Sequence, residues 1–137
     1  MTLEPKEIVR AFYDSSLNSG LDGLKNFLHE DCELNWNSSK GYNKFNYDNI
    51  VHILNDIKNS YESVRFQISH LLQDGNFVTT RYTLYVHTIE NPSKEVPLAH
   101  YITIWEVKDG KLFLGHEISQ LADDSVVSLN SFSKIKV

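Results

Sequence analysis

The feature that most constrains the fold of this chain is a change in hydrophobic periodicity near residue 60. Before that point, apolar residues recur every three or four positions in three segments, which predicts amphipathic helices over 4–19, 21–30 and 47–60. After it the period becomes two up to about residue 122, which predicts four strands joined in part by hairpin turns at 74–76 and 108–111. Helices early and strands late indicate an α+β fold rather than an alternating α/β fold.

A fifth strand is expected between the second and third helices, in "HEDCELNWN" (29–37). Cys32, Leu34 and Trp36 fall on one face of this strand. The following "SSKGYNKF" (38–45) consists largely of turn formers, and we expect a loop there. The acids and the histidine at the start of the stretch are consecutive, so they cannot all point at one ion, and no spaced ligand motif accompanies them. We therefore expect neither a metal nor an organic cofactor.

Composition limits the class of protein. A chain of 137 residues fits one domain, which we place at 1–122, with 123–137 as a tail that is either an arm for a partner subunit or a frayed end. The net charge is −5 and the thirteen Lys and Arg residues are scattered, which argues against a nucleic-acid partner. The chain has no apolar run long enough for a membrane span and no secretory signal. With a single cysteine, these features favour a cytoplasmic protein.

Three stretches together resemble the NTF2-like superfamily, the cone-shaped α+β fold of nuclear transport factor 2, ketosteroid isomerase and the SnoaL-like polyketide cyclases. They are "IVRAFYDSSLNSGLDGLKNFLHEDCELNW", a glycine before the third helix (Gly41), and "VKDGKLFLGHEIS". The resemblance covers about residues 4–122. It implies three helices packed on a curved mixed or antiparallel sheet that encloses a pocket. It does not imply one activity, because this fold hosts enzymes, carriers and dimerisation modules.

The resemblance to ketosteroid isomerases carries over only in part. Tyr13 matches the helix tyrosine that helps to form their oxyanion hole. Trp36 stands where they keep a general-base aspartate, and the strand "AHYITIW" lacks their second acid. Neither Trp nor its Asn neighbours can accept a proton from carbon at neutral pH. The usual ketosteroid isomerisation is therefore not expected.

The SnoaL-like cyclases resemble this chain more closely at the last strand. They place an acid–base carboxylate about six residues after the "DGK" lysine, which here is Glu117, next to His116. A carboxyl facing an apolar cone would have a raised pKa, as suits a general acid or base.

The cyclase pattern more often reads "EHWD" where this chain reads "GHEIS", and a one-residue slip would turn His116 inward in place of Glu117. The candidate catalytic residues are Glu117, Tyr13 and His116. The alternatives are a locally satisfied Tyr13 on its helix, and a Glu117 that is exposed or paired with Arg81.

Aromatic residues on several elements predict a pocket for a small apolar organic ligand. The ligand-binding candidates are Phe12, Trp36, Tyr85, Tyr101 and Trp105. Two classes of function stay open. One is an acid–base enzyme of the isomerase, cyclase or hydrolase type, and the other is a ligand-binding or dimerisation module without chemistry.

The strand "LAHYITIWEV" carries apolar residues on both faces. Tyr101, Thr103 and Trp105 share one face, and Ile102 and Ile104 share the other. Both faces of the sheet are therefore expected to be covered. Together with the resemblance, this pattern predicts a homodimer that forms through the convex face of the sheet.

Overall fold

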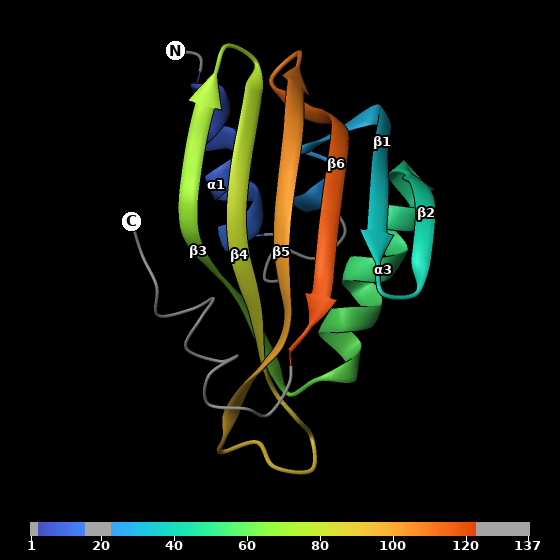
Figure 1. Cartoon of the computed structure of the whole chain (residues 1–137), viewed down its shortest axis with the longest axis vertical. Coiled ribbons are helices and arrows are strands. Elements are labelled where there is room, and N and C mark those ends of the chain that lie inside the picture. The colour runs from blue at the N-terminus through green and yellow to red at the C-terminus, as the bar shows by residue number, and fades with distance from the viewer. Residues whose placement is uncertain (1–2, 16–22, 123–137) are drawn as a thin grey trace.

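The computed structural model describes residues 3–15 and 23–122, which form helices packed on one six-stranded sheet (Figure 1). The helices are α1 (Pro5–Ser15) and α3 (Tyr47–Ser60). The strands are β1 (Leu28–Ser38), β2 (Gly41–Asn46), β3 (Ser63–Asp74), β4 (Phe77–His87), β5 (Glu95–Lys108) and β6 (Lys111–Leu121). The predicted α+β class and the NTF2-like cone are confirmed.

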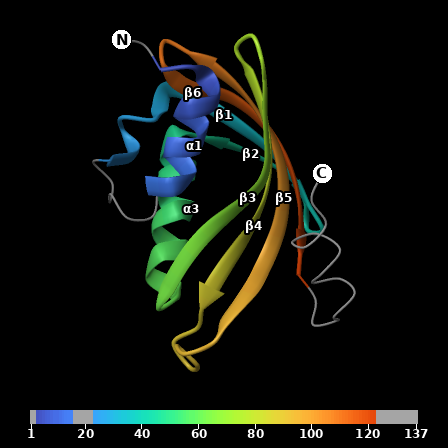
Figure 2. The ribbon, with the colours of Figure 1, turned by 90° about the vertical axis from the view of Figure 1, so that its left-hand side faces the viewer.

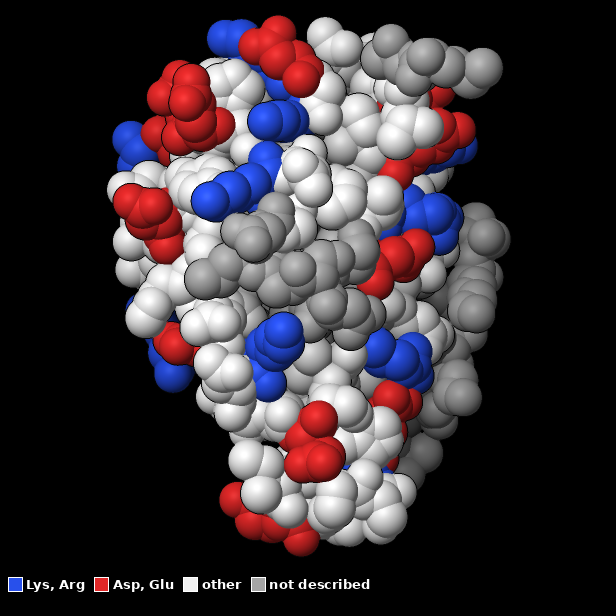
Figure 3. Space-filling model, turned by 180° about the vertical axis from the view of Figure 1, so that it is seen from behind, with Lys and Arg blue, Asp and Glu red and all other residues white. Residues whose placement is uncertain are grey.

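The sheet is mixed and curved. Its strand order is β2-β1-β6-β5-β4-β3, with β1 parallel to β6 and every other pair antiparallel. Both helices lie against the concave side, as Figure 2 shows. The face of the molecule that carries the helices presents acidic and basic side chains interspersed with one another (Figure 3). The core therefore lies between the concave face of the sheet and the helices.

Helix α3 begins and packs as its sequence predicts. Asn46 and Asn49 form a capping box, in which each side chain accepts a hydrogen bond from the other's backbone N–H, at 3.0 and 2.9 Å. Ile50 and Leu54 lie one turn apart on the side of the helix that faces the sheet, and both are buried. The capping box fixes where the helix starts, and the apolar stripe fixes which face it buries.

The expected helices 4–19 and 21–30 extend into residues 16–22, which lie outside the described part of the chain. In the second of these segments, the prediction fails from Leu28 onward because Leu28 opens β1 by pairing with Leu112 of β6. The predicted tail, 123–137, also lies outside the described residues. No helix in the described residues is long and apolar enough to cross a membrane.

The predicted loop over 38–45 is wrong. Residues Gly41–Asn46 form the edge strand β2, paired with β1 from Ser38 opposite Gly41 to Glu33 opposite Asn46. Ser39 and Lys40 make a two-residue turn, and Gly41 follows it with a φ of 107°, a conformation that favours glycine. The turn formers in this segment suggested a loop, but β1 has one edge paired with β6 and offers the other to β2. Pairing overrides the weak local preference.

Candidate functional site

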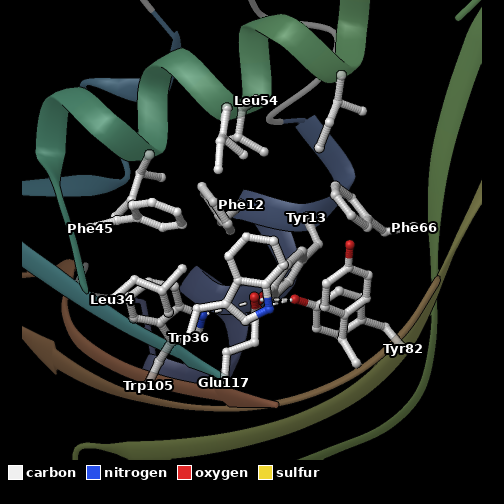
Figure 4. A pocket seen from close by; sticks show the side chains of 14 residues that line it. Phe12, Tyr13, Leu34, Trp36, Phe45, Leu54, Phe66, Tyr82, Trp105 and Glu117 are labelled. Carbon is white, nitrogen blue, oxygen red and sulfur yellow. Dashed lines mark hydrogen bonds between the residues drawn. The ribbon is translucent and has the colours of Figure 1, made fainter. Parts of the chain in front are cut away.

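A cavity lies between the concave face of the sheet and the two helices, and 14 described residues line it (Figure 4). About 80 Å³ of the cavity is open to the centre of a water molecule. Eight of the lining residues are aromatic and five aliphatic: Phe12, Tyr13, Trp36, Phe45, Phe66, Tyr82, Tyr101 and Trp105, with Leu34, Ile50, Ile53, Leu54 and Ile57. The fourteenth is Glu117. The cavity is thus an aromatic chamber with a single carboxyl group.

Strand pairing explains why Glu117 faces this cavity. Side chains alternate along β6, so Glu117 points to the concave side and His116 to the convex side. The parallel pairing with β1 sets Trp36 beside Glu117, and the antiparallel pairing with β5 sets Thr103 on its other side. Three strands therefore converge at the carboxyl group.

One carboxyl oxygen of Glu117 is held by the protein. Its Oε1 accepts hydrogen bonds from the Tyr82 hydroxyl at 2.8 Å and from Thr103 Oγ1 at 2.7 Å. No described residue donates a hydrogen bond to Oε2. The carboxyl group is thus fixed in orientation through Oε1, while its side chain lines the cavity and Oε2 has no donor among the described residues.

A chain of donors leads to Glu117 from the helix side. Trp105 Nε1 donates to the Tyr13 hydroxyl at 3.0 Å, and the Tyr13 hydroxyl donates to the Tyr82 hydroxyl at 3.1 Å. Tyr82 in turn donates to Glu117. The proton of Tyr13, expected from the resemblance to point at a substrate oxyanion, instead points at Tyr82. In this arrangement Tyr13 orients Tyr82.

The hydroxyl of Tyr101 differs from those of Tyr13 and Tyr82, because it makes no hydrogen bond to any described residue. The Tyr101 ring stacks on that of Tyr82 with centroids 4.9 Å apart and planes 9° apart. Tyr101 lines the same cavity as Glu117. Its hydroxyl is therefore the donor in this cavity that a ligand oxygen can use.

Burial controls the ionisation of the site. It raises the pKa of Glu117, while the hydrogen bonds from Thr103 and Tyr82 lower that pKa by less. Burial and the charge of Glu117 raise the pKa values of Tyr13, Tyr82 and Tyr101, so all three hydroxyls keep their protons at neutral pH. The site combines a weakened carboxylic acid with tyrosines that act only as neutral donors.

The structure brings together six of the eight predicted site residues: Phe12, Tyr13, Trp36, Tyr101, Trp105 and Glu117. His116 and Tyr85 are not among them, and we correct both. His116 is exposed on the convex face of β6. Tyr85 lies outside the cavity, with the Arg65 guanidinium 4.4 Å from its ring centre. Alternation along the strand places each of them on the face opposite to the cavity.

Tyr82 and Thr103, which hold Glu117, were not predicted as site residues. The pattern of β4 contains a signal for Tyr82, because it shares its strand face with Val78, Leu84 and Val86, all buried. Tyr85 falls on the other face, among polar residues. The alternation of apolar and polar residues along this strand could therefore have indicated that Tyr82, and not Tyr85, faces the cavity.

Cys32 and possible metal-binding groups were compared with the residues of the cavity. Burial raises the pKa of Cys32 to about 11, so this residue is a neutral thiol in the core. No group of three or more His, Cys, Asp or Glu side chains within 3–15 and 23–122 is arranged to hold a metal ion. Glu117 carries the one carboxyl group among the described residues that line the cavity.

Comparison with known proteins adds a family and a set of similar folds. The family model of the SnoaL-like domain matches residues 9–114. No curated protein matches the chain in sequence.

Solved structures with similar folds include IdmH from Streptomyces antibioticus, a candidate polyketide cyclase, with a TM-score of 0.72 and 15% identity over 93% of this chain and 96% of IdmH. AclR from Streptomyces galilaeus, a candidate hydroxylase, has a TM-score of 0.68 and 13% identity over 95% of this chain and 94% of AclR. A candidate SnoaL-like polyketide cyclase from Jannaschia sp. CCS1 has a TM-score of 0.63 and 12% identity over 96% of this chain and 92% of that protein. At these identities the likeness establishes the fold alone.

Proposed function

Because this chain belongs to the SnoaL-like domain family, we propose that it is an acid–base enzyme that moves a proton at a carbon atom next to a carbonyl group. The substrate class is a small, flat, largely apolar ketone. The observation that carries the proposal is the Glu117 carboxyl in an aromatic cavity, with Oε1 held by two donors and no described residue donating to Oε2. Two of the similar structures named above are candidate polyketide cyclases, and cyclisation of such molecules begins with this kind of proton transfer.

The proposed step uses Glu117 as the base and Tyr101 as the donor to oxygen. Glu117 Oε2 takes a proton from the carbon, and the electron pair of the C–H bond becomes the carbon–carbon double bond of an enolate. Negative charge develops on the carbonyl oxygen, where the Tyr101 hydroxyl, which has no hydrogen-bond partner among the described residues, donates a hydrogen bond. Protonated Glu117 then returns the proton to carbon, or to the alkoxide oxygen that forms when the enolate attacks a second carbonyl group.

A simple ketone tests this proposal without knowledge of the natural substrate. We expect the protein to accelerate the exchange of the C1 protons of 2-tetralone with deuterium, followed by ¹H NMR in deuterated buffer. Because the carboxylate is the active form and its pKa is raised, the enzymatic rate should fall on acidification with a midpoint above about 4.3, the ordinary value for Glu. Tyr82→Phe removes a donor that stabilises the carboxylate, and should move this midpoint to higher pH.

The same assay separates the enzyme from the binding module. A protein that binds 2-naphthol, a flat mimic of the enol of this ketone, but leaves the exchange rate at the buffer value is a ligand-binding module and not an enzyme of this class. A pH midpoint that Tyr82→Phe leaves unchanged would remove Glu117 from the role of base.

We also propose a homodimer through the convex face of the sheet. Ile102, Ile104 and Ile118 are exposed on this face by 41%, 42% and 60%, and Ile102 lies directly opposite Ile118 in the β5–β6 pairing. An exposed apolar cluster in the middle of a sheet face is typical of an interface with another chain. A second copy presents the same cluster, and a twofold axis through it would bury both.

Ile118→Lys is expected to convert this dimer into a monomer, because a lysine ammonium in the centre of an apolar interface loses its hydration. Sedimentation velocity measures the change. Ile89→Lys is a matched control, since Ile89 is also 60% exposed but lies in the connection between β4 and β5. A wild-type monomer at micromolar concentration, or a dimer that survives Ile118→Lys, would contradict the proposal.

A further inference from the structure

A second cavity adjoins the aromatic chamber at the end of the sheet where the β1–β2 turn lies. We call it the outer groove. By the same measure of space open to the centre of a water molecule it has about 250 Å³, roughly three times the 80 Å³ of the inner cavity. Its walls come from the β1–β2 turn, the residue after α3, and the adjoining ends of β5 and β6. The larger part of the available space thus lies outside the chamber that contains Glu117.

Two side chains, Trp36 and Tyr101, line both spaces and so divide them. Trp36 Nε1 donates to Ser119 Oγ at 2.7 Å, and the Trp36 ring packs against Phe45 with centroids 5.6 Å apart. In the described residues this is the one hydrogen bond of the indole. A ligand that extends from one space into the other would therefore have to pass Trp36 and Tyr101.

The register of the strands gives the distance between the far ends of the two spaces. Trp36 lies opposite Glu117, and Lys40 lies four residues further on, in the turn that leads into β2. Two strand residues and part of a tight turn separate them, which corresponds to roughly 10 Å along the strand. A molecule that contacts Glu117 at one end reaches Lys40 if it has two fused rings and a substituent on the far ring.

The outer groove differs in chemistry from the inner cavity. It combines apolar residues with the hydroxyls of Ser38, Ser39 and Ser119, and Lys40 is the charged residue in its described lining. No acidic side chain of the described residues pairs with the Lys40 ammonium. The two spaces together therefore have a carboxyl group at the inner end and, at the outer rim, a cation that no acidic side chain of the described residues pairs with.

We propose that the ligand extends through both spaces, and that it is an elongated aromatic acid whose anionic group, remote from the reacting carbon, binds Lys40. This inference rests on the proposed function, because it takes Glu117 as the reacting end. An anion near Glu117 would be repelled, whereas an anion at the outer rim is attracted. Lys40 would thus select both the charge of the ligand and its direction of entry.

Three naphthols test the inference by fluorescence titration: 2-naphthol, 6-hydroxy-2-naphthoate and 3-hydroxy-2-naphthoate. The first lacks a carboxylate, the second carries it far from the hydroxyl, and the third carries it next to the hydroxyl. With the wild-type protein we expect 6-hydroxy-2-naphthoate to bind up to about fivefold more tightly than 2-naphthol, the upper range for an exposed ion pair. We expect 3-hydroxy-2-naphthoate to bind most weakly, and the advantage of the 6-hydroxy isomer to decrease with added salt.

Lys40→Gln should remove the preference for 6-hydroxy-2-naphthoate and leave the affinity for 2-naphthol unchanged. Lys6→Gln is the matched control, because Lys6 is an exposed lysine of α1 whose backbone N–H donates to Gln73 of β3, and Figure 1 shows β3 at the opposite edge of the sheet from β1 and β2. Equal affinities of wild type for 2-naphthol and 6-hydroxy-2-naphthoate, or a preference that survives Lys40→Gln, would overturn the inference. Binding involves no proton transfer, so a negative result here with intact 2-tetralone exchange leaves the proposed function standing. In the reverse pattern, the proposed function and the role of Glu117 as the reacting end are overturned, and only the binding of an anionic group at Lys40 remains.

Discussion

Replacement of Glu117 with Gln is expected to lower the rate of 2-tetralone exchange at least about 100-fold, the usual contribution of a general base. The amide has the shape of the carboxyl, and its oxygen still accepts hydrogen bonds from Tyr82 and Thr103. It cannot take a proton from carbon at neutral pH. The loss is measured by ¹H NMR at a pH where wild-type exchange has reached its plateau.

Glu106→Gln is the control for this variant. Glu106 is a carboxylic acid on the neighbouring strand β5, and alternation turns it away from the cavity that its neighbour Trp105 lines. We expect wild-type exchange from Glu106→Gln. Exchange that persists in Glu117→Gln would show that another group is the base.

Loss of folding does not explain the expected loss of activity, because Glu117→Gln should be at least as stable as wild type at neutral pH. The pKa of Glu117 is higher in the folded than in the unfolded protein, so the folded state binds the proton more tightly. Wild type therefore loses stability as the pH rises from about 4.3, the unfolded value, through the folded pKa. The variant lacks this loss. Urea denaturation measures the difference in free energy of unfolding between Glu117→Gln and wild type. This difference should be absent below about pH 4, should grow as the pH rises, and should be constant above the folded pKa of Glu117.

The second large effect is expected at Gly115, where β6 passes under the aromatic core. A methyl group built on Gly115 would lie 2.7 Å from Cζ3 of Trp105 and 2.8 Å from Cδ1 of Leu34. Both distances are shorter than carbon atoms tolerate, and both neighbours are buried. Gly115→Ala should therefore destabilise the protein by about 1–3 kcal/mol, measured by urea denaturation. The displaced Trp105 also donates to Tyr13, so the donor chain to Glu117 should be disturbed and exchange should slow.

A double-mutant cycle distinguishes this overlap from a general effect on strand β6. Trp105→Phe makes the neighbouring ring smaller, and Gly115→Ala should destabilise the protein less in that background. Gln120→Ala, on the exposed side of the same strand, should change stability by no more than about 0.5 kcal/mol. Additive effects of Gly115→Ala and Trp105→Phe would refute the proposed contact.

Sequence patterns were sufficient to locate the helices and strands in which apolar residues recur at a regular spacing. The stripe of Ile50 and Leu54 located α3, and alternation with turn signals located β3 to β6. They were insufficient for β2, because its residues are turn formers that pair only when β1 offers an edge. Local propensity describes a segment alone, whereas an edge strand depends on its neighbour.

The direction of Glu117 shows a different limit of the sequence. In "LFLGHEIS" apolar residues occupy consecutive positions 112–114, so the pattern does not say which face of β6 is buried. The ambiguity between Glu117 and His116 follows from this run. The register with Thr103 and Trp36 removes it, because each pair of facing residues shares a side of the sheet.

By itself, the sequence determined the α+β class, the family resemblance, a set of aromatic residues for the pocket, and Glu117 as the candidate acid–base carboxyl group. Only the tertiary structure decided which of these side chains meet. The donor chain joins Trp105 to Tyr13, Tyr13 to Tyr82 and Tyr82 to Glu117 across sequence separations of 92, 69 and 35 residues. Local patterns reach only a few residues along the chain. Contacts at these separations depend on strand register and on the curvature that closes the sheet around the helices, and these arise when the whole chain packs.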